Sequence, residues 1–286
     1  MSCVGIRSCT RQYRFKCTIN GACENDRDGI IIARRLEFFA PENFPLVEPG
    51  DDIVELLLSA LHEEEFVPQN GDILVFAQKI ISKSENRFVD LLSIVPSSEA
   101  EDLATKCDKD ARLVQLILNE STEVLRCVPG VMIVRHKLGY VMANAGIDRS
   151  NVASCEGVER VLLLPASPDN SAQHLRRELQ RKTGCELAVI ISDSFGRPWR
   201  LGTSGVCIGC DGIASLLDQR GDSDMFGQEL MVTQVAIGDE LATAASLLMG
   251  QADEARPVVI IRGLEFQREP ASARHLLRPP AEDLFS

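Results

Sequence analysis

Three segments of this sequence combine residue types that bind cations and phosphates. They contribute Lys83, the pair Asp148 and Asn151, and the pair Asp193 and Ser194. Carboxylate, hydroxyl and amide oxygens are the ligands that Mg²⁺ prefers, and a lysine ammonium can meet a phosphate as a point charge. Each segment follows a predicted strand, where a scaffold commonly presents its working groups. These residues therefore indicate metal-assisted chemistry on a phosphate.

Each segment also has a purely structural interpretation, which the sequence leaves open. A lysine after an apolar strand commonly extends into solvent, and Asp148 and Asn151 are of the commonest turn-forming types. Asp193 could cap a helix after a tight turn. Arg197 and Arg200 flank the only tryptophan, and they could clamp an anion or form a structural stack.

The markers of several other enzyme classes are absent from the sequence. It contains no HExxH, P-loop, GxGxxG or GxSxG pattern, which disfavours metalloproteases, Walker-type NTPases, Rossmann dehydrogenases and α/β-hydrolases. Cys207 and Cys210 form a single CxxC pair, which supplies half of a four-ligand zinc site. Without a second pair at matching spacing, these cysteines are interpreted as small hydrophobic residues.

Hydrophobic periodicity and turn signals predict the elements that must position these residues. Helices are expected over residues 53–61, 98–107 (opened by the capping box of Ser98 and Glu101), 111–126, 170–183 and 239–249. Strands are expected over 30–33, 73–81, 161–164, 187–192 and 258–262, with a hairpin of 131–135 and 140–143. Helices and strands alternate, so the predicted fold is α/β, a mixed α+β arrangement with a mixed sheet.

Composition limits the class of protein. Of 286 residues, 45% are hydrophobic and 25% charged, which is typical of a globular protein with a sizeable core. The net charge of -12 repels phosphate backbones and anionic lipid, so neither nucleic-acid nor membrane binding is expected. No run approaches the roughly 18 apolar residues that a spanning helix needs.

The two ends of the chain differ from the predicted core. Residues 1–29 contain four cysteines and no sustained periodicity, and we expect them to form an extension. No apolar stretch follows the basic residues there, so we expect no secretory signal and a cytoplasmic protein. Residues 266–286, with their prolines, are expected to be a loosely attached tail.

Several segments resemble those of the coenzyme F420-0:L-glutamate ligases, a family also called F420 gamma-glutamyl ligases. The resemblance lies in the segments FAQKIISKSENR, ANAGIDRSN, SDSFGRPWR and MVTQVAIGDELATAASLLMGQADEARPVVIIRG, which occur in the family's order between about residues 34 and 263. The resemblance implies a catalytic domain over residues 30–265 with the fold of that family. It also implies a GTP-dependent ligase that activates a carboxylate as an acyl phosphate, which the amine of L-glutamate then attacks.

The resemblance assigns roles to individual positions. Those matching nucleotide-binding positions are Phe44, Pro45, Leu46, Val47, Gln78, Lys83, Asn151, Met249, Gly250, Gln251, Ala252, Asp253, Glu254, Ala255 and Arg256. Those matching metal-binding positions are Asp148, Asp193, Ser194 and Gln251, and the catalytic group is Asp148, Asp193 and Lys83. The implied cofactors are GTP as the substrate nucleotide, Mg²⁺ or Mn²⁺, and K⁺. A homodimer is also implied, and we expect Asp148 and Asp193 to lie close enough to share cations.

Two segments depart from the family pattern. Thr203 replaces an amide, Cys210 and Asp211 enter a stretch that is normally small and apolar, and the loop over residues 220–227 is altered. If these segments line the acceptor pocket, the acceptor could differ from the deazaflavin. Two alternatives therefore stand beside F420-0 ligation: a related ligase for another small carboxylic acid and amino acid, and a non-catalytic nucleotide-binding protein.

Overall fold

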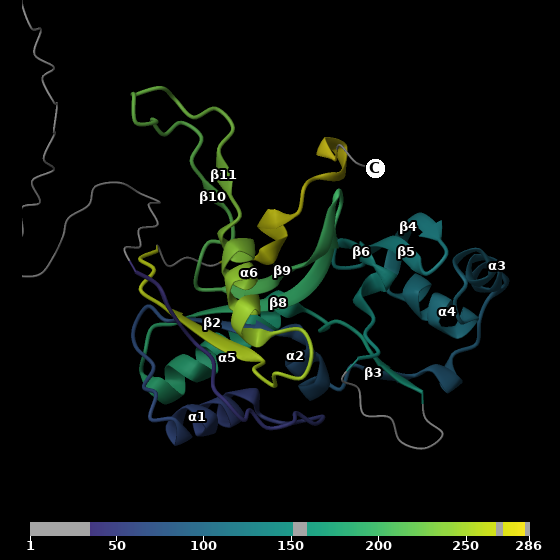
Figure 1. The fold of residues 1–286 in the computed structure, drawn as a ribbon, viewed down its shortest axis with the longest axis horizontal. Helices are drawn as coiled ribbons and strands as arrows, with labels where there is room; N and C mark the ends of the chain where they lie inside the picture. Colours follow the sequence, from purple (N-terminus) through teal and green to yellow (C-terminus); the bar gives the residue numbers. More distant parts are fainter. Residues whose placement is uncertain (1–34, 151–158, 267–270, 284–286) are drawn as a thin grey trace, which may run out of the picture.

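A five-stranded mixed sheet forms the centre of the computed structural model, which describes residues 35–150, 159–266 and 271–283. The strand order is β1-β12-β2-β8-β9 (Figure 1). Only β2 and β8 run parallel, and every other neighbouring pair in this sheet is antiparallel. The sheet consists of β1 (Glu37–Phe39), β12 (Val258–Arg262), β2 (Ile73–Ala77), β8 (Ala188–Arg197) and β9 (Arg200–Asp211).

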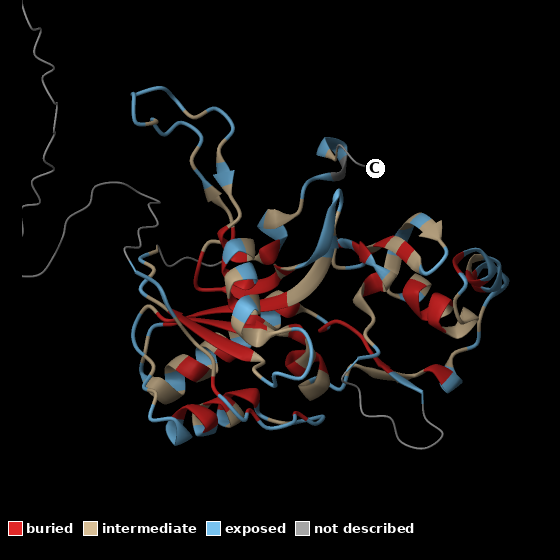
Figure 2. Cartoon of the chain, in the orientation of Figure 1, coloured by how far each residue is buried: buried red, intermediate tan, exposed pale blue. Residues whose placement is uncertain are grey.

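Helices cover both faces of this sheet, which explains why β2, β8 and β12 are nearly continuous apolar runs. On one face, α1 (Ile53–Glu63) and α5 (Pro168–Thr183) pack against alternate strand residues such as Leu74 and Val189. On the other face, α6 (Ile237–Met249) packs against the intervening residues. The buried residues concentrate in this three-layered region (Figure 2). The predicted mixed α/β fold is therefore confirmed.

A smaller group of elements stands beside the main sheet (Figure 1). Its core is formed by α3 and α4 packed against the antiparallel sheet β4-β5-β6. The bounds are α3 (Ser98–Cys107), α4 (Ala111–Asn119), β4 (Ser121–Val128), β5 (Val131–His136), β6 (Val141–Ala143) and η2 (Asn144–Gly146). The hairpin of β5 and β6 confirms the predicted turn. A short pair, β3 (Phe88–Asp90) and β7 (Arg160–Leu162), precedes and follows these elements, with η1 (Leu91–Ser93) after β3.

Several predicted boundaries are wrong. The run over residues 73–81 is not one strand, because α2 (Gln78–Ser84) begins after Ala77. The helix predicted over 111–126 ends at Asn119, because the following residues pair with β5 as strand β4. Helix α3 is capped by Ser97, whose side chain accepts from the backbone N–H of Ala100, and the capping box of Ser98 and Glu101 is not formed. The strand predicted over 30–33 lies outside the described residues.

The C-terminal segment is attached more firmly than predicted. In η3 (Ala273–Leu276), Ala273 is fully buried against the α6 side of the sheet. The Asp169 carboxylate, at the start of α5, accepts from the Ser272 hydroxyl and the Ala273 backbone N–H. A last 3₁₀ turn, η4 (Pro280–Glu282), follows. In the described ranges no helix is long and apolar enough to cross a membrane.

Candidate functional site

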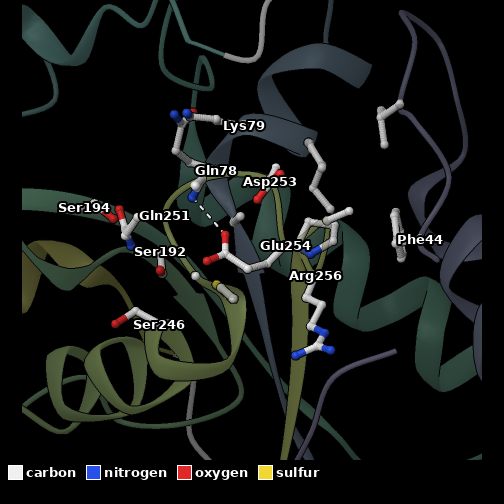
Figure 3. A pocket seen from close by; sticks show the side chains of 18 of the residues that line it. Phe44, Gln78, Lys79, Ser192, Ser194, Ser246, Gln251, Asp253, Glu254 and Arg256 are labelled. Atoms are coloured by element: carbon white, nitrogen blue, oxygen red, sulfur yellow. Dashed lines mark hydrogen bonds between the residues drawn. The ribbon is translucent and has the colours of Figure 1, made fainter. Parts of the chain in front are cut away.

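A cavity of about 580 Å³ opens where β2 and β8 end (Figure 3). Volumes of about 300–1,000 Å³ are typical of small-molecule sites. Four segments supply its lining: residues 44–47, the start of α2, residues 192–194 of β8, and the loop of residues 249–257 with Ser246. Figure 3 shows Ser192, Ser194 and Gln251 close together on one side and Phe44 on the opposite side, with Glu254 between them.

Strand pairing explains why these segments meet. Because β2 and β8 are parallel, with Ala77 opposite Ser192, the first turn of α2 and Asp193 emerge at the same edge of the sheet. Strand β12 is antiparallel to β2, with Val258 opposite Phe76, so the loop before β12 reaches that edge as well. Ligand sites commonly form at the carboxyl ends of strands in sheets of this kind.

Helix α2 supplies the cationic side of the cavity. Lys79 and Lys83 are four residues apart, so they project from one face of the helix, and both line the cavity. Burial lowers the pKa of Lys83, although the charges of Glu48 and Asp148 oppose this effect. Gln78 is buried, and its side-chain amide oxygen Oε1 accepts from the Ser82 hydroxyl at 2.8 Å. Lys83 is thus a helical residue and not, as predicted, one at the end of a strand.

Lys79 connects the cavity to Asp148. Its Nζ lies 2.6 Å from Asp148 Oδ2 and 2.8 Å from the Ser150 hydroxyl oxygen. Asp148 is positioned by reciprocal backbone hydrogen bonds with Leu162. Burial raises the pKa of Asp148, but hydrogen bonds from Lys79 and Ser150 outweigh it, so the net pKa is lowered. Sequence reasoning missed Lys79, although its spacing of four from Lys83 was a signal.

Asp193 lies in the wall of the cavity, inside strand β8. It is therefore not the helix cap that the structural interpretation allowed. Burial and the negative charge of Asp148 together raise its pKa to about 6, although a hydrogen bond from the Ser194 backbone N–H and the charge of Lys79 oppose this rise. Asp148 and Asp193 thus interact electrostatically across the end of α2. The predicted close approach of their carboxylates and the sharing of cations both stay predictions.

The loop after α6 folds around an internal carboxylate. Glu254 Oε2 accepts from the Ala252 backbone N–H at 2.8 Å, and further backbone hydrogen bonds from Glu254 and Gln251 help to lower its pKa. Gly250 has a φ of 71°, and a Cβ at this position would clash with the Glu254 carboxyl group. The loop's backbone N–H groups are therefore held by its own carboxylate, which fixes the shape of the loop.

The donor set around the cavity fits a hard divalent cation. Asp148, Asp193, Ser194 and Gln251 offer only oxygen ligands of the types that Mg²⁺ and Mn²⁺ prefer. Asp148 already holds a cation, the ammonium group of Lys79. In the described part of the chain, no group of three or more His, Cys, Asp or Glu residues is arranged to hold a metal ion by itself. Any metal would therefore need hydroxyl or amide oxygens, water or phosphate to complete its coordination.

Comparison with known proteins places this arrangement in a family. The model of the F420-0:Gamma-glutamyl ligase family matches residues 42–263. The chain belongs to the F420-0:gamma-glutamyl ligase family. It is 47% identical over 246 residues to the coenzyme F420:L-glutamate ligase of Methanothermobacter thermautotrophicus, covering 85% of this chain and 96% of the relative. The corresponding ligase of Methanopyrus kandleri is 44% identical over 243 residues, covering 84% and 93%.

A relative of lower identity matches over a similar length. The coenzyme F420:L-glutamate ligase of Haloarcula marismortui is 39% identical over 255 residues, covering 87% of this chain and 95% of the relative. The matched family segment, residues 42–263, includes every part of the cavity lining. The ligase resemblance inferred from the sequence motifs is therefore confirmed.

The structure brings most of the predicted site residues together. The cavity is lined by Gln78, Lys83, Asp193, Ser194 and residues 44–47 and 249–256. Asp148 is connected to it through the ion pair with Lys79. Asn151 lies outside the described residues. Besides Lys79, sequence reasoning missed Ser192 and Ser246, whose small polar side chains carried no distinguishing pattern. The individual roles assigned to these residues stay predictions.

Proposed function

We propose that this protein is a GTP-dependent amide ligase acting on coenzyme F420-0 or its glutamyl forms. It would join a carboxylate of this acceptor to the amine of L-glutamate. The observation that carries the proposal is the cavity itself, in which residues matching the family's nucleotide positions line one continuous space. Family membership over residues 42–263 supports the same ligase chemistry.

The nucleotide would lie in this cavity with its phosphates toward α2 and β8. Lys79 and Lys83 bring positive charge to one wall of the cavity. Phe44 and Leu46 give the far wall an apolar surface suited to a base. Phosphoryl transfer depends chiefly on positioning and charge neutralisation, which these groups would provide.

Asp148, Asp193, Ser194 and Gln251 would hold Mg²⁺ or Mn²⁺, and the family resemblance adds K⁺. When bound, such cations neutralise charge that develops on the transferred phosphoryl group. Asp193 would need to be ionised as a ligand, and a nearby cation favours that form. Lys79 would then leave Asp148 and turn toward the phosphates.

The reaction balances in two steps. An acceptor carboxylate oxygen attacks the γ-phosphorus of GTP, and GDP leaves, which gives an acyl phosphate. The amine of L-glutamate then attacks the acyl carbon, inorganic phosphate leaves with its electron pair, and the amine loses a proton. The protein positions the reactants and needs no covalent nucleophile, so the cysteines have no catalytic role in this scheme.

We also propose a homodimer. Between β10 (Leu217–Asp218) and β11 (Gln234–Val235), an arm stands away from the main body (Figure 1). Its large apolar side chains are exposed, including Met225 at 96% and Phe226 at 88%. Exposed apolar surface of this kind is typical of protein interfaces. Light scattering at micromolar concentration should give twice the chain mass, and a monomeric mass would contradict the proposal.

The test of the ligase proposal is phosphate release from GTP with Mg²⁺ or Mn²⁺, L-glutamate and a panel of acceptors. Release that requires F420-0, with a product heavier by one glutamyl residue in mass spectrometry, is expected. Release only with another carboxylic acid would favour the related ligase, and nucleotide binding without release would favour the non-catalytic alternative. ATP in place of GTP serves as the matched control for nucleotide choice.

A further inference from the structure

Arg197, at the end of β8, has a charged group without a partner. Its Nη1 atom is buried and makes no hydrogen bond in the described part of the chain. A guanidinium stays protonated in proteins, so this atom carries part of a full positive charge. Burying such a donor without an acceptor costs free energy, and a protein commonly keeps such a group where a ligand supplies the acceptor.

A second arginine lies directly opposite. In the antiparallel pairing of β8 and β9, Arg197 is the register partner of Arg200, and directly opposed residues share one face of the sheet. Like charges in this position destabilise a hairpin. No ion pair involves either arginine among the residues described, whereas Arg87, Arg176 and Arg262 all have carboxylate partners. This arginine pair, Arg197 with Arg200, therefore lacks an internal counter-ion.

Arg197 lies at the end of the strand that carries Asp193, and Arg200 begins the next strand, β9. Side chains alternate along β8, which places Asp193 and Phe195 on one face, and the register with β9 shifts between Gly196 and Arg197. Phe195 confirms this orientation, because it packs edge-on against Tyr140 on that face, with ring centroids 6.0 Å apart. Four residues of strand span roughly 13 Å. A substrate reacting at Asp193 could thus reach the arginine pair with a group elsewhere in the same molecule.

We infer that Arg197, assisted by Arg200, binds an oxyanion of the substrates that are joined, away from the reacting carboxylate. Neither arginine lines the proposed nucleotide cavity, so a phosphate of GTP is not the ligand. The class of ligand is a carboxylate or phosphate, which a guanidinium binds through two parallel hydrogen bonds. It belongs to the acceptor acid or to L-glutamate. This inference rests on the proposed function, which places the reacting carboxylate beside Asp193.

The test compares Arg197→Met, which keeps length but removes the charge, with Arg197→Lys. We expect Arg197→Met to raise KM at least tenfold for the acceptor or for L-glutamate, while KM for GTP stays unchanged. Which KM rises identifies the source of the oxyanion. Arg197→Lys should recover part of the loss, and Arg200→Met should have a smaller effect because Arg200 is exposed. Unchanged KM for both substrates would overturn the inference.

Two controls separate this result from other causes. Arg181→Met removes an arginine that is paired with Glu178 on the surface of α5, and it should change no KM. Arg197→Met should melt at or above the wild-type temperature, since it removes an unpartnered charge. A large loss of stability would show a structural role instead and would overturn the inference.

A binding experiment separates failure of the inference from failure of the proposed function. F420-0 alone, without GTP, should raise the melting temperature of the wild type more than that of Arg197→Met, or L-glutamate should do so. This readout needs no turnover. Equal shifts for both proteins, or no shift with either compound, would overturn the inference, whereas absence of turnover with any acceptor would contradict the proposed function.

Discussion

The ammonium nitrogen of Lys79 lies 2.6 Å from Asp148 Oδ2, and the same nitrogen lies 2.8 Å from the hydroxyl of Ser150, which is 71 positions later in the chain. This ion pair joins the cavity to the aspartate that the family resemblance assigns to a metal. A lysine in this position neutralises Asp148 when no metal is bound. It also competes with any divalent cation for the same carboxylate oxygen.

Replacing Lys79 by Met should separate these two effects. Without the competing ammonium, the dissociation constant for Mn²⁺ in the absence of nucleotide should fall several-fold. GTP-dependent turnover should fall by at least tenfold, because positive charge against the phosphates is lost. Electron paramagnetic resonance of free Mn²⁺ and phosphate release measure the two quantities.

Lys83→Met is the matched control for Lys79, because it removes a lysine from the same face of α2 that makes no ion pair with Asp148. It should weaken turnover without tightening Mn²⁺ binding. Equal Mn²⁺ affinity in wild type and Lys79→Met would contradict competition between the lysine and the metal.

Asp193→Asn keeps the shape of the side chain and removes its charge. We expect turnover to fall by orders of magnitude at ordinary Mg²⁺ concentration, because a charged metal ligand is lost. Without metal, the variant should be more stable than wild type by about 1–3 kcal/mol at neutral pH, since a pKa raised to about 6 reflects a disfavoured carboxylate. Thermal melting and phosphate release provide the measurements.

The pH dependence of the Asp193→Asn effect gives an internal check. A carboxyl group whose folded pKa is raised lowers stability as the pH rises from the unfolded pKa, near 4, to the folded pKa, because the unfolded chain ionises first, and the loss is complete once the folded group ionises as well. The stability gain should therefore be complete above pH 6 and vanish near pH 4. Near wild-type turnover in this variant would remove Asp193 from the mechanism.

Gly250→Ala should disturb the 250–254 loop. The added Cβ would clash with the Glu254 carboxyl group, and the φ of 71° disfavours any side chain. We expect at least tenfold weaker GTP binding and a loss of about 1–2 kcal/mol in stability. Gly184→Ala, at the end of α5, is the matched control because its φ is 73° and it has open space around it. It should cost less stability, because its ψ of 3° lies in the left-handed helical region whereas Gly250 has a ψ of -173°. It should leave GTP affinity unchanged, as calorimetry would measure.

His136 should make the protein sensitive to mild acid. Burial lowers its pKa to about 4, and the charges of Lys137 and Arg87 act in the same direction. Below pH 6.5 the unfolded chain binds a proton that the folded protein refuses until about pH 4, so stability falls across this window by up to about 3 kcal/mol. Glu120 Oε2 lies 3.9 Å from Nε2.

The comparison variant for acid sensitivity is His136→Asn. Its side-chain oxygen can replace Nδ1 as the acceptor for the Leu138 backbone N–H, and it does not titrate. Denaturant melts at pH 7 and pH 5 should differ less in this variant than in wild type. The exposed His62→Asn should behave like wild type. An equal pH dependence in His136→Asn and wild type would count against this assignment.

Local sequence patterns determined the parts of the fold that depend on local physics. The apolar runs in β2, β8 and β12 indicated buried strands, and helical spacing indicated α1, α5 and α6, because side-chain period depends on residues a few positions apart. The order of the family motifs also determined which segments meet at the site. Those motifs contain the cavity-lining residues of α2, of β8 and of the loop over residues 249–257.

Tertiary structure alone decided where the long apolar runs change conformation. The run over 73–81 becomes helix α2 after Ala77, because β2 is only as long as its pairing with β8 and β12. Residues 121–128 form β4 because β5 offers a partner, which outweighs their moderate helix pattern. The ion pair of Lys79 and Asp148 likewise arises from strand pairing between distant segments. The hydrophobic periodicity of a segment depends only on its own residues and carries no information about which distant segment it contacts. Only the folded chain could therefore show these contacts.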